Sequence, residues 1–361
     1  MKAGLEHALH RAWARKGLFS QLMWPLSRLY AAIVAGRRAG YERRPERVHH
    51  DTVPVVVVGN IYVGGTGKTP VVIALTQALQ ARGWTPGIIS RGYGVKHDVR
   101  PRAGQGQLDP ALFGDEPALI AAETGAPVCV HPDRRAAIRR LRRQYPAIDV
   151  VISDDGLQHL ALGRDMEIVV QDARGIGNGC LLPAGPLREP VERLESVDFI
   201  INNLLPTETA PALPTGLAHV VNMCMEPREV EHLVTGERQS WAHWLSAHQN
   251  APCAAVAAIG RPERFFGMLQ HQGLKLQDTL ALPDHHGYEV SPFQALKAEC
   301  ILITPKDAVK CSRHADARLY CVHPGPRFSD ATWLALAAEM LRAISDRKLA
   351  SARAEALNSD F

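Results

Sequence analysis

The stretch PVVVVGNIYVGGTGKTP, Pro54 to Pro70, decides the fold. Residues 55–58 are four consecutive valines, which is typical of a strand buried on both faces of a parallel sheet. A glycine-rich loop follows, and residues 71–82 have the pattern of a helix. A strand, a glycine-rich loop and a helix in this order form the context of a P-loop. The stretch therefore predicts an α/β protein that binds phosphate.

The loop itself presents several groups that bind phosphate. It consists of Gly64, Gly65, Thr66, Gly67, Lys68 and Thr69. Its backbone N–H groups and the N-terminus of the following helix supply positive potential. We expect Lys68 to reach the β- and γ-phosphates of a nucleotide and Thr69 to bind Mg²⁺. The alternative, a glycine turn without a ligand, does not explain the strand and helix on either side.

The loop departs from the usual pattern at one position. Tyr62 stands six residues before the lysine, where a glycine is usual. The local sequence resembles the deviant loops of ParA-like ATPases and metallochaperone GTPases. Those proteins often carry a signature lysine just before the first glycine pair, and this chain has Val63 there.

A second apolar strand is predicted over 148–153, and Asp154-Asp155-Gly156 ends it. Ligands of doubly wound sheets bind outside the carboxyl ends of the strands. A carboxylate at that edge beside a P-loop is the usual partner of Mg²⁺. We therefore predict that Asp154 or Asp155 holds the ion, and the sequence leaves open which one; a simple turn is the alternative.

Three further segments are candidates for the acceptor site. In GDEP, 114–117, Asp115 and Glu116 either cap a helix or contribute a general base. In HPDRR, 131–135, Arg134 either reaches a phosphorylated or lipid substrate or begins a solvated helix. Gln158 follows the paired aspartates by one turn. We assign Glu116, Arg134 and Gln158 to substrate binding.

The remaining pattern predicts two α/β domains. Strands recur at 86–90, 166–171 and 199–202 with helices between them, which indicates a doubly wound parallel sheet. A second α/β unit begins at 254–260. The expected division is a basic amphipathic arm (1–50), a P-loop domain (51–216), a linker region (217–250), a smaller C-terminal α/β domain (251–345) and a tail (346–361).

The second domain contains LPDHHGY, 282–288, at the end of a predicted strand. Asp284, His285 and His286 do not make a zinc site, because no third spaced ligand accompanies them. A histidine that acts in catalysis or contacts phosphate is the better interpretation. TPKDAVK, 304–310, is only weakly similar to loops that recognise nucleotide bases.

Composition narrows the class of protein. Seven cysteines without a CxxC pair make a disulfide framework or a thiolate zinc site improbable. We expect a reduced, cytosol-facing location and no secretory signal. Residues 1–50 carry ten Lys and Arg against three Glu, whereas the whole chain has a net charge of +4. The basic character is therefore local, which argues against a nucleic-acid partner and for a basic arm.

The arm has an apolar helical face between 18 and 33, flanked by arginines on both sides. Pro25 and Arg28 interrupt the apolar run, and a spanning helix needs roughly 20 largely uncharged residues. An apolar face with cationic flanks is typical of a helix that lies at the membrane surface. We favour this interpretation over a helix packed on the core or a true span.

Together these segments resemble one family, the tetraacyldisaccharide 4′-kinases, which are the lipid A disaccharide kinases of Gram-negative bacteria. The resemblance extends from the arm to about residue 325. It rests on GNIYVGGTGKTP, SRGYG (90–94), GDEP, HPDRR, DDGLQH (154–159), LLPAGPLREP (181–190), PDHHGY and TPKDAVK, in the family's order.

The resemblance implies a specific reaction. ATP, with Mg²⁺, would phosphorylate the 4′-hydroxyl of a tetraacylated glucosamine disaccharide 1-phosphate, at the cytoplasmic face of the inner membrane. It also implies a short β linker between the domains. By the same resemblance, Asp115 activates the hydroxyl with His285 as its partner, Arg188 faces the phosphates, and Tyr93 meets the acceptor. No obligate protein partner is expected.

Two other functions compete with this one. A nucleotide switch of the metallochaperone GTPase or ParA-like class would form a nucleotide-bridged dimer and need no small acceptor. A membrane-peripheral scaffold would use nucleotide only for stability. Val63 weakens the first alternative, and Asp115 and His285 would be superfluous in the second.

Overall fold

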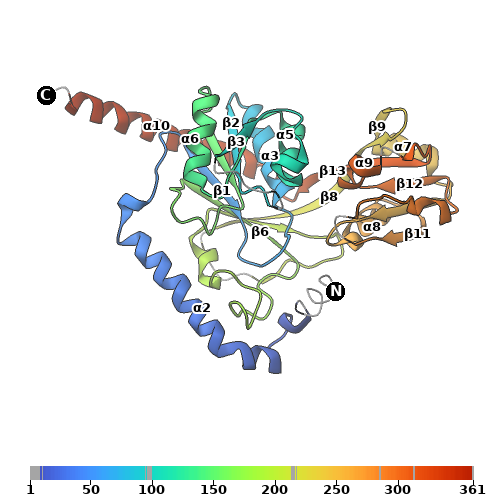
Figure 1. Ribbon diagram of the computed structural model, residues 1–361, viewed down its shortest axis with the longest axis horizontal. Coiled ribbons are helices and arrows are strands. Elements are labelled where there is room, and N and C mark those ends of the chain that lie inside the picture. The colour runs from blue at the N-terminus through green and yellow to red at the C-terminus, as the bar shows by residue number, and fades with distance from the viewer. Residues whose placement is uncertain are drawn as a thin grey trace. The chain divides into compact units, whose positions relative to one another are not determined.

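The computed structural model divides the chain into two compact units, coloured along the chain in Figure 1. The residues it describes are 9, 11–93, 95, 100–212, 216, 218–283, 286–311 and 314–359. The first unit comprises Met1–Asn203, Thr209–Asn222 and Phe328–Phe361, and the second comprises Leu204–Glu208 and Met223–Arg327.

The sheet of the first unit has the strand order β7-β6-β1-β5-β2-β4-β3. Its strands are β1 (Val55–Gly59), β2 (Pro86–Ser90), β3 (Arg102–Gly104), β4 (Val128–Val130), β5 (Val150–Asp154), β6 (Met166–Asp172) and β7 (Phe199–Asn203). All neighbours are parallel except β3, which is antiparallel to β4. The strand before the P-loop lies between β5 and β6, and the predicted doubly wound parallel sheet is confirmed.

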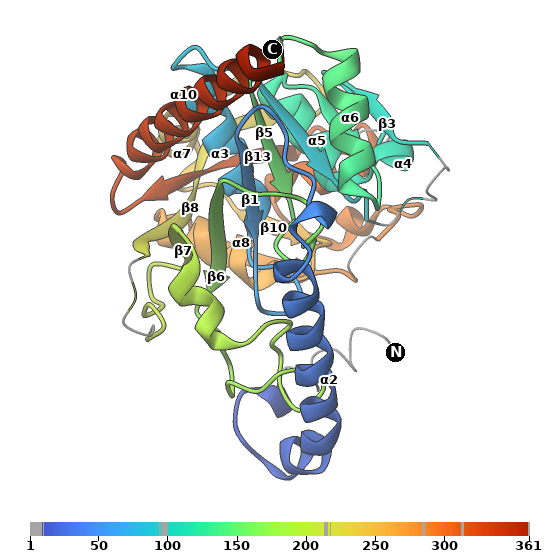
Figure 2. The same ribbon diagram turned by 90° about the vertical axis from the view of Figure 1, so that its left-hand side faces the viewer.

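Helices lie on both faces of this sheet (Figures 1 and 2). They are α3 (Lys68–Gln80), α4 (Pro110–Phe113), α5 (Asp115–Thr124) and α6 (Arg134–Gln144), with the 3-10 helices η1 (Pro45–Arg47) and η2 (Val191–Ser196). Val55 and Val57 pack in one cluster with Ile138 and Leu141 of α6. Helix α3 contacts β1, β2 and β5 and packs beside α5. The continuous apolar runs of the strands are explained by this cover on both faces.

The C-terminal helix α10 (Trp333–Ser359) belongs to the first unit. Arg342 lies over the Trp84 ring at 4.5 Å, and Lys348 pairs with Asp165 at 2.8 Å. The sequence pattern predicts that residues up to 345 belong to the second domain and that the rest form a tail. The structure differs because α10 packs on α3, a contact that its sequence pattern does not identify.

Helix α2 (Leu18–Glu42) packs on the first unit through one side, on which Ser20 and Ser27 are buried and Met23 and Tyr30 are half-buried. Leu22 is 73% and Leu29 is 60% exposed. The leucines of the arm's apolar face are therefore uncovered rather than packed on a core. No helix within the described ranges is long and apolar enough to cross a membrane.

The second unit contains a smaller parallel sheet in the order β11-β10-β12-β13. Its strands are β10 (Cys253–Ala257), β11 (Leu276–Ala281), β12 (Cys300–Ile303) and β13 (Leu319–Phe328), and β8 (His219–His232), which begins in the first unit, pairs antiparallel with β9 (Arg238–Ser240). Its helices are α7 (Trp241–His248), α8 (Pro262–His271), η3 (Pro292–Ala295) and α9 (Pro305–Cys311). Two apolar clusters form its core.

Candidate active site

Two asparagines, Asn60 and Asn203, hold the P-loop through hydrogen bonds from their side-chain amides. The Asn60 amide donates to the Gly64 carbonyl at 3.0 Å and to Thr66 Oγ1 at 3.3 Å. Asn203, the last residue of β7, donates to the Thr66 carbonyl at 3.0 Å. Gly67 has a φ of 90°, and a Cβ there would collide with the Asn203 amide. These contacts fix the loop in a conformation that only glycine tolerates at position 67.

Tyr62 explains why this loop lacks the upstream glycine. Its side chain is buried, and the Arg174 guanidinium lies 4.4 Å from its ring centroid. Arg174 donates to the Gly65 carbonyl at 2.8 Å and pairs with Asp172 at 2.7 Å. The aromatic ring thus supports the arginine that braces the loop, which is a packing role that glycine cannot perform.

Asp154, the last residue of β5, is buried with an incomplete set of hydrogen bonds. Its Oδ2 accepts from Ser90 Oγ at 3.0 Å. Its Oδ1 has no hydrogen-bond partner in the described part of the chain. Burial raises the pKa of this carboxyl to about 6, and the nearby Glu116 carboxylate adds to the rise, while Lys68 opposes it. A buried oxygen without a partner is suited to accept a cation.

Asp155 is held by two cations. Its Oδ1 lies 3.4 Å from Lys68 Nζ and 3.5 Å from Arg188 NH1. Burial acts to raise its pKa, but Lys68 and Arg188 outweigh burial, so the pKa falls below its ordinary value. The backbone φ of 48° is unusual for a residue other than glycine. This strained position directs the carboxylate toward the P-loop lysine.

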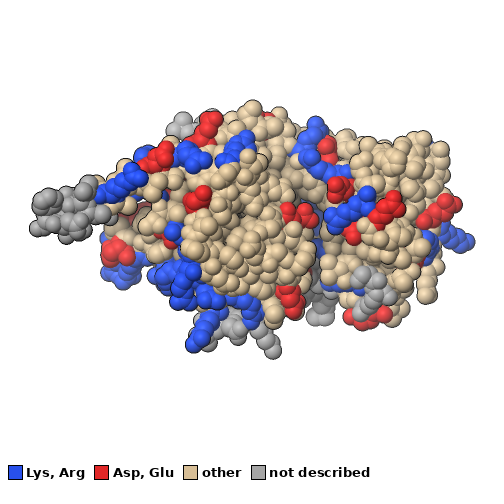
Figure 3. All heavy atoms as spheres, turned by 90° about the horizontal axis from the view of Figure 1, so that it is seen from above, with Lys and Arg blue, Asp and Glu red and all other residues tan. Residues whose placement is uncertain are grey.

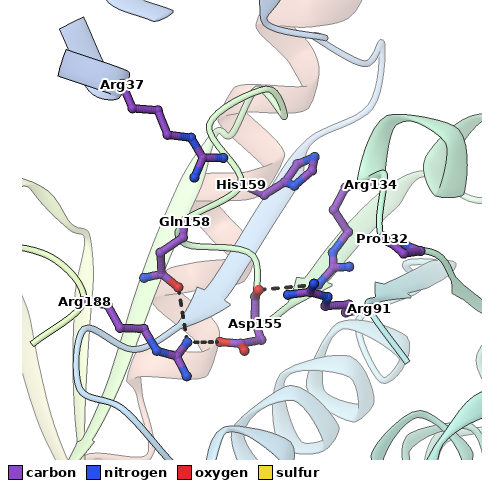
Figure 4. Close-up of a pocket in the computed structure, with 8 residues that line it drawn as sticks. All are labelled: Arg37, Arg91, Pro132, Arg134, Asp155, Gln158, His159 and Arg188. Carbon is purple, nitrogen blue, oxygen red and sulfur yellow. Dashed lines mark hydrogen bonds and ion pairs between the residues drawn. The ribbon is translucent and has the colours of Figure 1, made fainter. Parts of the chain in front are cut away.

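A pocket of about 270 Å³ opens beside Asp155. Its lining residues are Arg37, Arg91, Pro132, Arg134, Asp155, Gln158, His159 and Arg188. Figure 4 shows Asp155 with Arg188 on one side and Arg134 and Arg91 on the other. Four arginines against one carboxylate give the pocket a positive charge, so it is suited to an anionic ligand.

Arg134 forms the floor of this pocket. It is only 3% exposed and donates to the carbonyls of Asp154 and His131, both at 3.0 Å. Burial lowers its pKa to about 10, although Asp154 and Asp155 oppose the shift. Burial and Arg134 together lower the pKa of His159 to about 4. His159 is therefore neutral near pH 7 and offers the pocket a hydrogen-bonding nitrogen rather than a charge.

The segment 178–188 connects this site to α2. The Ser27 hydroxyl donates to the Leu181 carbonyl at 2.8 Å, and the Asn178 amide donates to Ser20 Oγ at 2.9 Å. The Tyr30 hydroxyl donates to the carbonyl of Arg188 at 3.1 Å. The two serines are thus buried because they anchor the helix to the loop that carries Arg188. The same packing leaves the apolar face of α2 outward.

The structure brings together part of the set of residues proposed from the sequence. Lys68, Asp155, Gln158 and Arg188 are in direct contact, and Arg134 lies beside them. Asp115 and Glu116 are the first two residues of α5, and Tyr93 is 87% exposed. Asp284 and His285 lie outside the described residues. The roles of these residues remain predictions.

Several further residues of the site were not identified as functional residues from the sequence. They are Arg37, Asn60, Ser90, Arg91, Arg174, Glu189 and Asn203. One signal was available, because Ser90 ends one predicted parallel strand and Asn203 directly follows another, and ligands of such sheets bind at strand ends. Glu189 and Arg91 lie within quoted motifs, but nothing in their spacing indicates what they contact.

The donor set suits magnesium better than a protein-enclosed metal. No group of three or more His, Cys, Asp or Glu side chains that could hold a metal occurs among the residues described. Mg²⁺ usually takes one or two carboxylates and completes its shell with phosphate and water. Asp154, with its unpartnered oxygen, and Thr69, at the start of α3, fit this requirement.

Comparisons with known proteins agree with this geometry. The family described as tetraacyldisaccharide-1-P 4′-kinase matches residues 19–342. A tetraacyldisaccharide 4′-kinase of Bordetella petrii is 54% identical over 323 residues, 89% of this chain and 91% of that protein. One from Bordetella parapertussis is 52% identical over 326 residues, 90% and 94% of the two chains. The crystal structure of LpxK from Aquifex aeolicus with ATP has a TM-score of 0.74 and 25% identity, over 91% of this chain and 99% of that one.

Proposed function

Because the chain belongs to the tetraacyldisaccharide-1-P 4′-kinase family, we infer that it transfers the γ-phosphate of ATP to a sugar hydroxyl of an acylated disaccharide. The acceptor is the 4′-hydroxyl of a tetraacylated glucosamine disaccharide 1-phosphate, a precursor of lipid A. The alternative of a nucleotide switch is not favoured, because relatives named as kinases match most of the chain.

The observation that carries this function is the contact between the P-loop lysine and the arginine-lined pocket. Lys68 and Arg188 share the same oxygen of Asp155, and Asp155 also lines the pocket. A phosphate on the P-loop and an anionic acceptor in the pocket would therefore meet at this carboxylate. Such proximity supports transfer between two bound groups rather than hydrolysis alone.

Phosphoryl transfer depends on alignment and on charge neutralisation more than on a strong base. The N–H groups of the loop and Lys68 hold the β- and γ-phosphates. Arg188 is paired with Asp155. Once this pair opens, its guanidinium neutralises the negative charge of the phosphoryl group that is transferred. Arg134 and Gln158 orient the acceptor in the pocket, and Glu116 and Tyr93 are also assigned to substrate binding.

Magnesium is the ion that the site fits. When bound, the ion would supply positive charge against the negative charge that develops on the phosphate oxygens. We propose that Asp154 is the direct ligand, with Thr69, because Asp154 has a free oxygen whereas Asp155 is already paired with two cations.

Activation of the acceptor hydroxyl is assigned to Asp115, with His285 as its partner. A sugar hydroxyl is a weak nucleophile, so a carboxylate that accepts its proton helps the reaction. An imidazole bonded to this carboxylate would orient it and assist the departure of the proton. This assignment rests on the GDEP and PDHH segments and on the division into a P-loop domain and a smaller C-terminal domain.

The exposed face of α2 supports a place at the membrane. Leu18, Leu22, Trp24, Leu26, Leu29 and Ile33 are all more than half exposed. Exposed arginines follow at the C-terminal end of the helix. We propose that this face lies in the cytoplasmic surface of the inner membrane, where its lipid substrate is. The proposed function requires neither a nucleic acid nor an obligate protein partner. On the face seen in Figure 3, Lys and Arg form separate groups interspersed with Asp and Glu, so this face has no continuous basic surface of the kind that binds nucleic acid.

One experiment tests the function directly. Purified protein is mixed with γ-labelled ATP, Mg²⁺ and the tetraacylated disaccharide 1-phosphate in detergent, and the lipid fraction is analysed. We expect label in a lipid that carries phosphate at both ends of the disaccharide. Label that appears only as inorganic phosphate, together with a nucleotide-dependent dimer, would favour a switch instead.

A further inference from the structure

A cluster of buried charged side chains lies next to the site but does not line its pocket. It consists of Arg164, Glu167, Glu189 and Arg193. We propose that Glu167 and Arg193 are positioning residues for the transfer, acting through Gln158 on Arg188 and Asp155. The proposal rests on the kinase function inferred above.

Arg193, in η2, is held between two carboxylates. It is 5% exposed; one end of its guanidinium contacts Glu167 Oε1, and its Nε lies 3.4 Å from Glu189 Oε2. Its NH1 donates to Ser196 Oγ at 2.7 Å. Burial opposes the charge of Arg193, but Glu167 and Glu189 raise its pKa above the ordinary value. The planar guanidinium fork, with N–H donors on different sides, can bind both carboxylates at once, which the single ammonium group of a lysine cannot do in the same geometry.

Glu189 connects Arg193 to Gln158. Its Oε1 accepts from Gln158 Nε2 at 2.6 Å, and the same nitrogen donates to the Asn60 carbonyl at 3.0 Å. Two acceptors on one side fix which end of the amide is nitrogen. Gln158 Oε1 is therefore directed to Arg188, from which it accepts at 3.3 Å (Figure 4). Without Glu189, the amide nitrogen keeps only the Asn60 carbonyl as its acceptor, so its orientation is less firmly held.

Glu167 also controls the backbone on which Gln158 stands. Arg164 NH1 lies 3.1 Å from Glu167 Oε1 and donates to the Leu157 carbonyl at 2.8 Å. Arg164 NH2 donates to the His159 carbonyl at 2.7 Å. One carboxylate on β6 thus holds the turn around Gln158 through Arg164 and the Gln158 side chain through Arg193 and Glu189.

Stability alone is a poor explanation for such a cluster. Buried ion pairs are often no more stabilising than apolar side chains of similar size. Buried ion pairs do fix the positions of the side chains around them, and small displacements of catalytic groups lower reaction rates strongly. The contacts run from Glu167 to Asp155 and Lys68 without a gap.

Arg193→Lys tests the proposal, since it keeps the charge but removes the fork. We expect kcat to fall roughly 10- to 100-fold, with little change in KM for ATP. Arg142→Lys is the matched control, because Arg142 pairs with Asp51 at 2.8 Å in the same unit, away from the pocket. The control should retain kcat. A wild-type kcat in Arg193→Lys would overturn the proposal.

A double-mutant cycle separates positioning from general loss of structure. If Arg193 acts through Gln158, then Gln158→Ala combined with Arg193→Lys should lose little more kcat than Gln158→Ala alone. Losses that multiply would overturn the proposal. If Arg193→Lys does not fold, Glu189→Gln takes its place in the same cycle, with the same two outcomes, because Glu189 lies between Arg193 and Gln158.

A crystal structure of Arg193→Lys provides a readout that needs no lipid substrate. We expect the Gln158 amide to leave Glu189 and Arg188. A Gln158 side chain that stays in place would refute the positioning role even if the kinase assay succeeds. Absence of lipid phosphorylation by the wild-type protein would instead refute the proposed function, and the position of Gln158 would still decide this inference.

Discussion

Each unit has a buried aspartate at the carboxyl edge of its parallel sheet, and the two are bonded in opposite ways. In the second unit, Asp307 accepts from Thr304 Oγ1 at 2.6 Å, and both its oxygens accept from Ala258 N at 3.3 Å. In the first unit, Asp154 accepts from Ser90, and its Oδ1 is without a partner among the described residues.

This difference separates a structural carboxylate from a functional one. A buried polar group left without a partner destabilises a fold by about 1–3 kcal/mol. The chain satisfies Asp307 with its own groups, as expected for a residue that ties β12 and α9 to β10. It leaves Asp154 unsatisfied next to a P-loop, where a cation can complete its contacts. The same place in two sheets therefore does not imply the same role.

The largest expected effect concerns Asp115 and His285. If it is found, the second unit also supplies a functional side chain, and the contrast between a functional first unit and a structural second unit no longer holds for the units as a whole. Asp115→Ala and His285→Ala should each lower kcat about 10²–10⁴-fold. The double variant should lose little more, because groups that act as one unit are not additive. KM for ATP should change less than kcat, since neither residue is assigned to the nucleotide.

Independent roles would give losses that multiply in the double variant. A His285→Ala protein with wild-type turnover would leave the second unit without a part in the chemistry. Asp115 would then be only an acidic residue in the first turn of α5, and the base would have to be sought elsewhere.

Asp154→Asn sharpens the comparison through activity and stability together. Transfer that depends on Mg²⁺ should fall by at least roughly 10²-fold, as expected when a group that stabilises transition-state charge is lost. The ion-free protein should become more stable at pH 7, by on the order of 1–3 kcal/mol. A Mg²⁺ titration of kcat and a thermal melt with chelator measure the two effects.

The gain in stability should depend on pH in a defined direction. Burial raises the pKa of Asp154 from 3.8 to about 6 in the folded protein, so folding favours the protonated form. Its contribution to stability is then present at low pH and is lost as the pH rises through about 4 to 6. Asp154→Asn should accordingly equal wild type near pH 4. The control Asp307→Asn should be less stable than wild type at pH 7; equal gains in both variants would contradict the distinction.

The smallest effect concerns the exposed leucines of α2. Replacing Leu22, Leu26 and Leu29 with serine should weaken binding to anionic vesicles at least about tenfold, because a leucine contributes roughly 1.5 kcal/mol or more when buried. Leu349→Ser on α10 is the control, since Leu349 is also exposed. Co-sedimentation that is unchanged by the triple substitution would place the membrane contact elsewhere.

Local sequence was enough to predict the strands and the P-loop. Val55–Val58 and the run before Asp154 are continuous apolar segments ended by polar residues, and such segments have few alternatives in a domain of this size. The same pattern did not predict that α10 returns to the first unit. Trp333 and Leu341 of α10 are fully buried, and Trp333 lies against Phe199 of β7, but an apolar residue in the sequence does not say against which unit it packs. Arg342 and Lys348 add contacts from side chains that are ordinarily left in solvent.

The site was predictable only where a motif carries it. Lys68, Asp155 and Arg188 stand in recognisable segments, and the structure joins them. Their supports could not be predicted, because Arg193 and Glu167 are ordinary charged residues until the fold buries them side by side. The packing side of α2 was missed for a related reason, since its two serines gain their role only from the carbonyl and amide opposite them.

Lys68→Ala in the lipid transfer assay tests the central claim most directly. Lys68 is proposed to touch both the transferred phosphate and the carboxylate that lines the acceptor pocket. The account predicts that kcat falls at least roughly 10²–10³-fold while the far-UV spectrum of the variant remains that of the wild-type protein. A folded Lys68→Ala protein that transfers phosphate to the disaccharide at a near-normal kcat would contradict it.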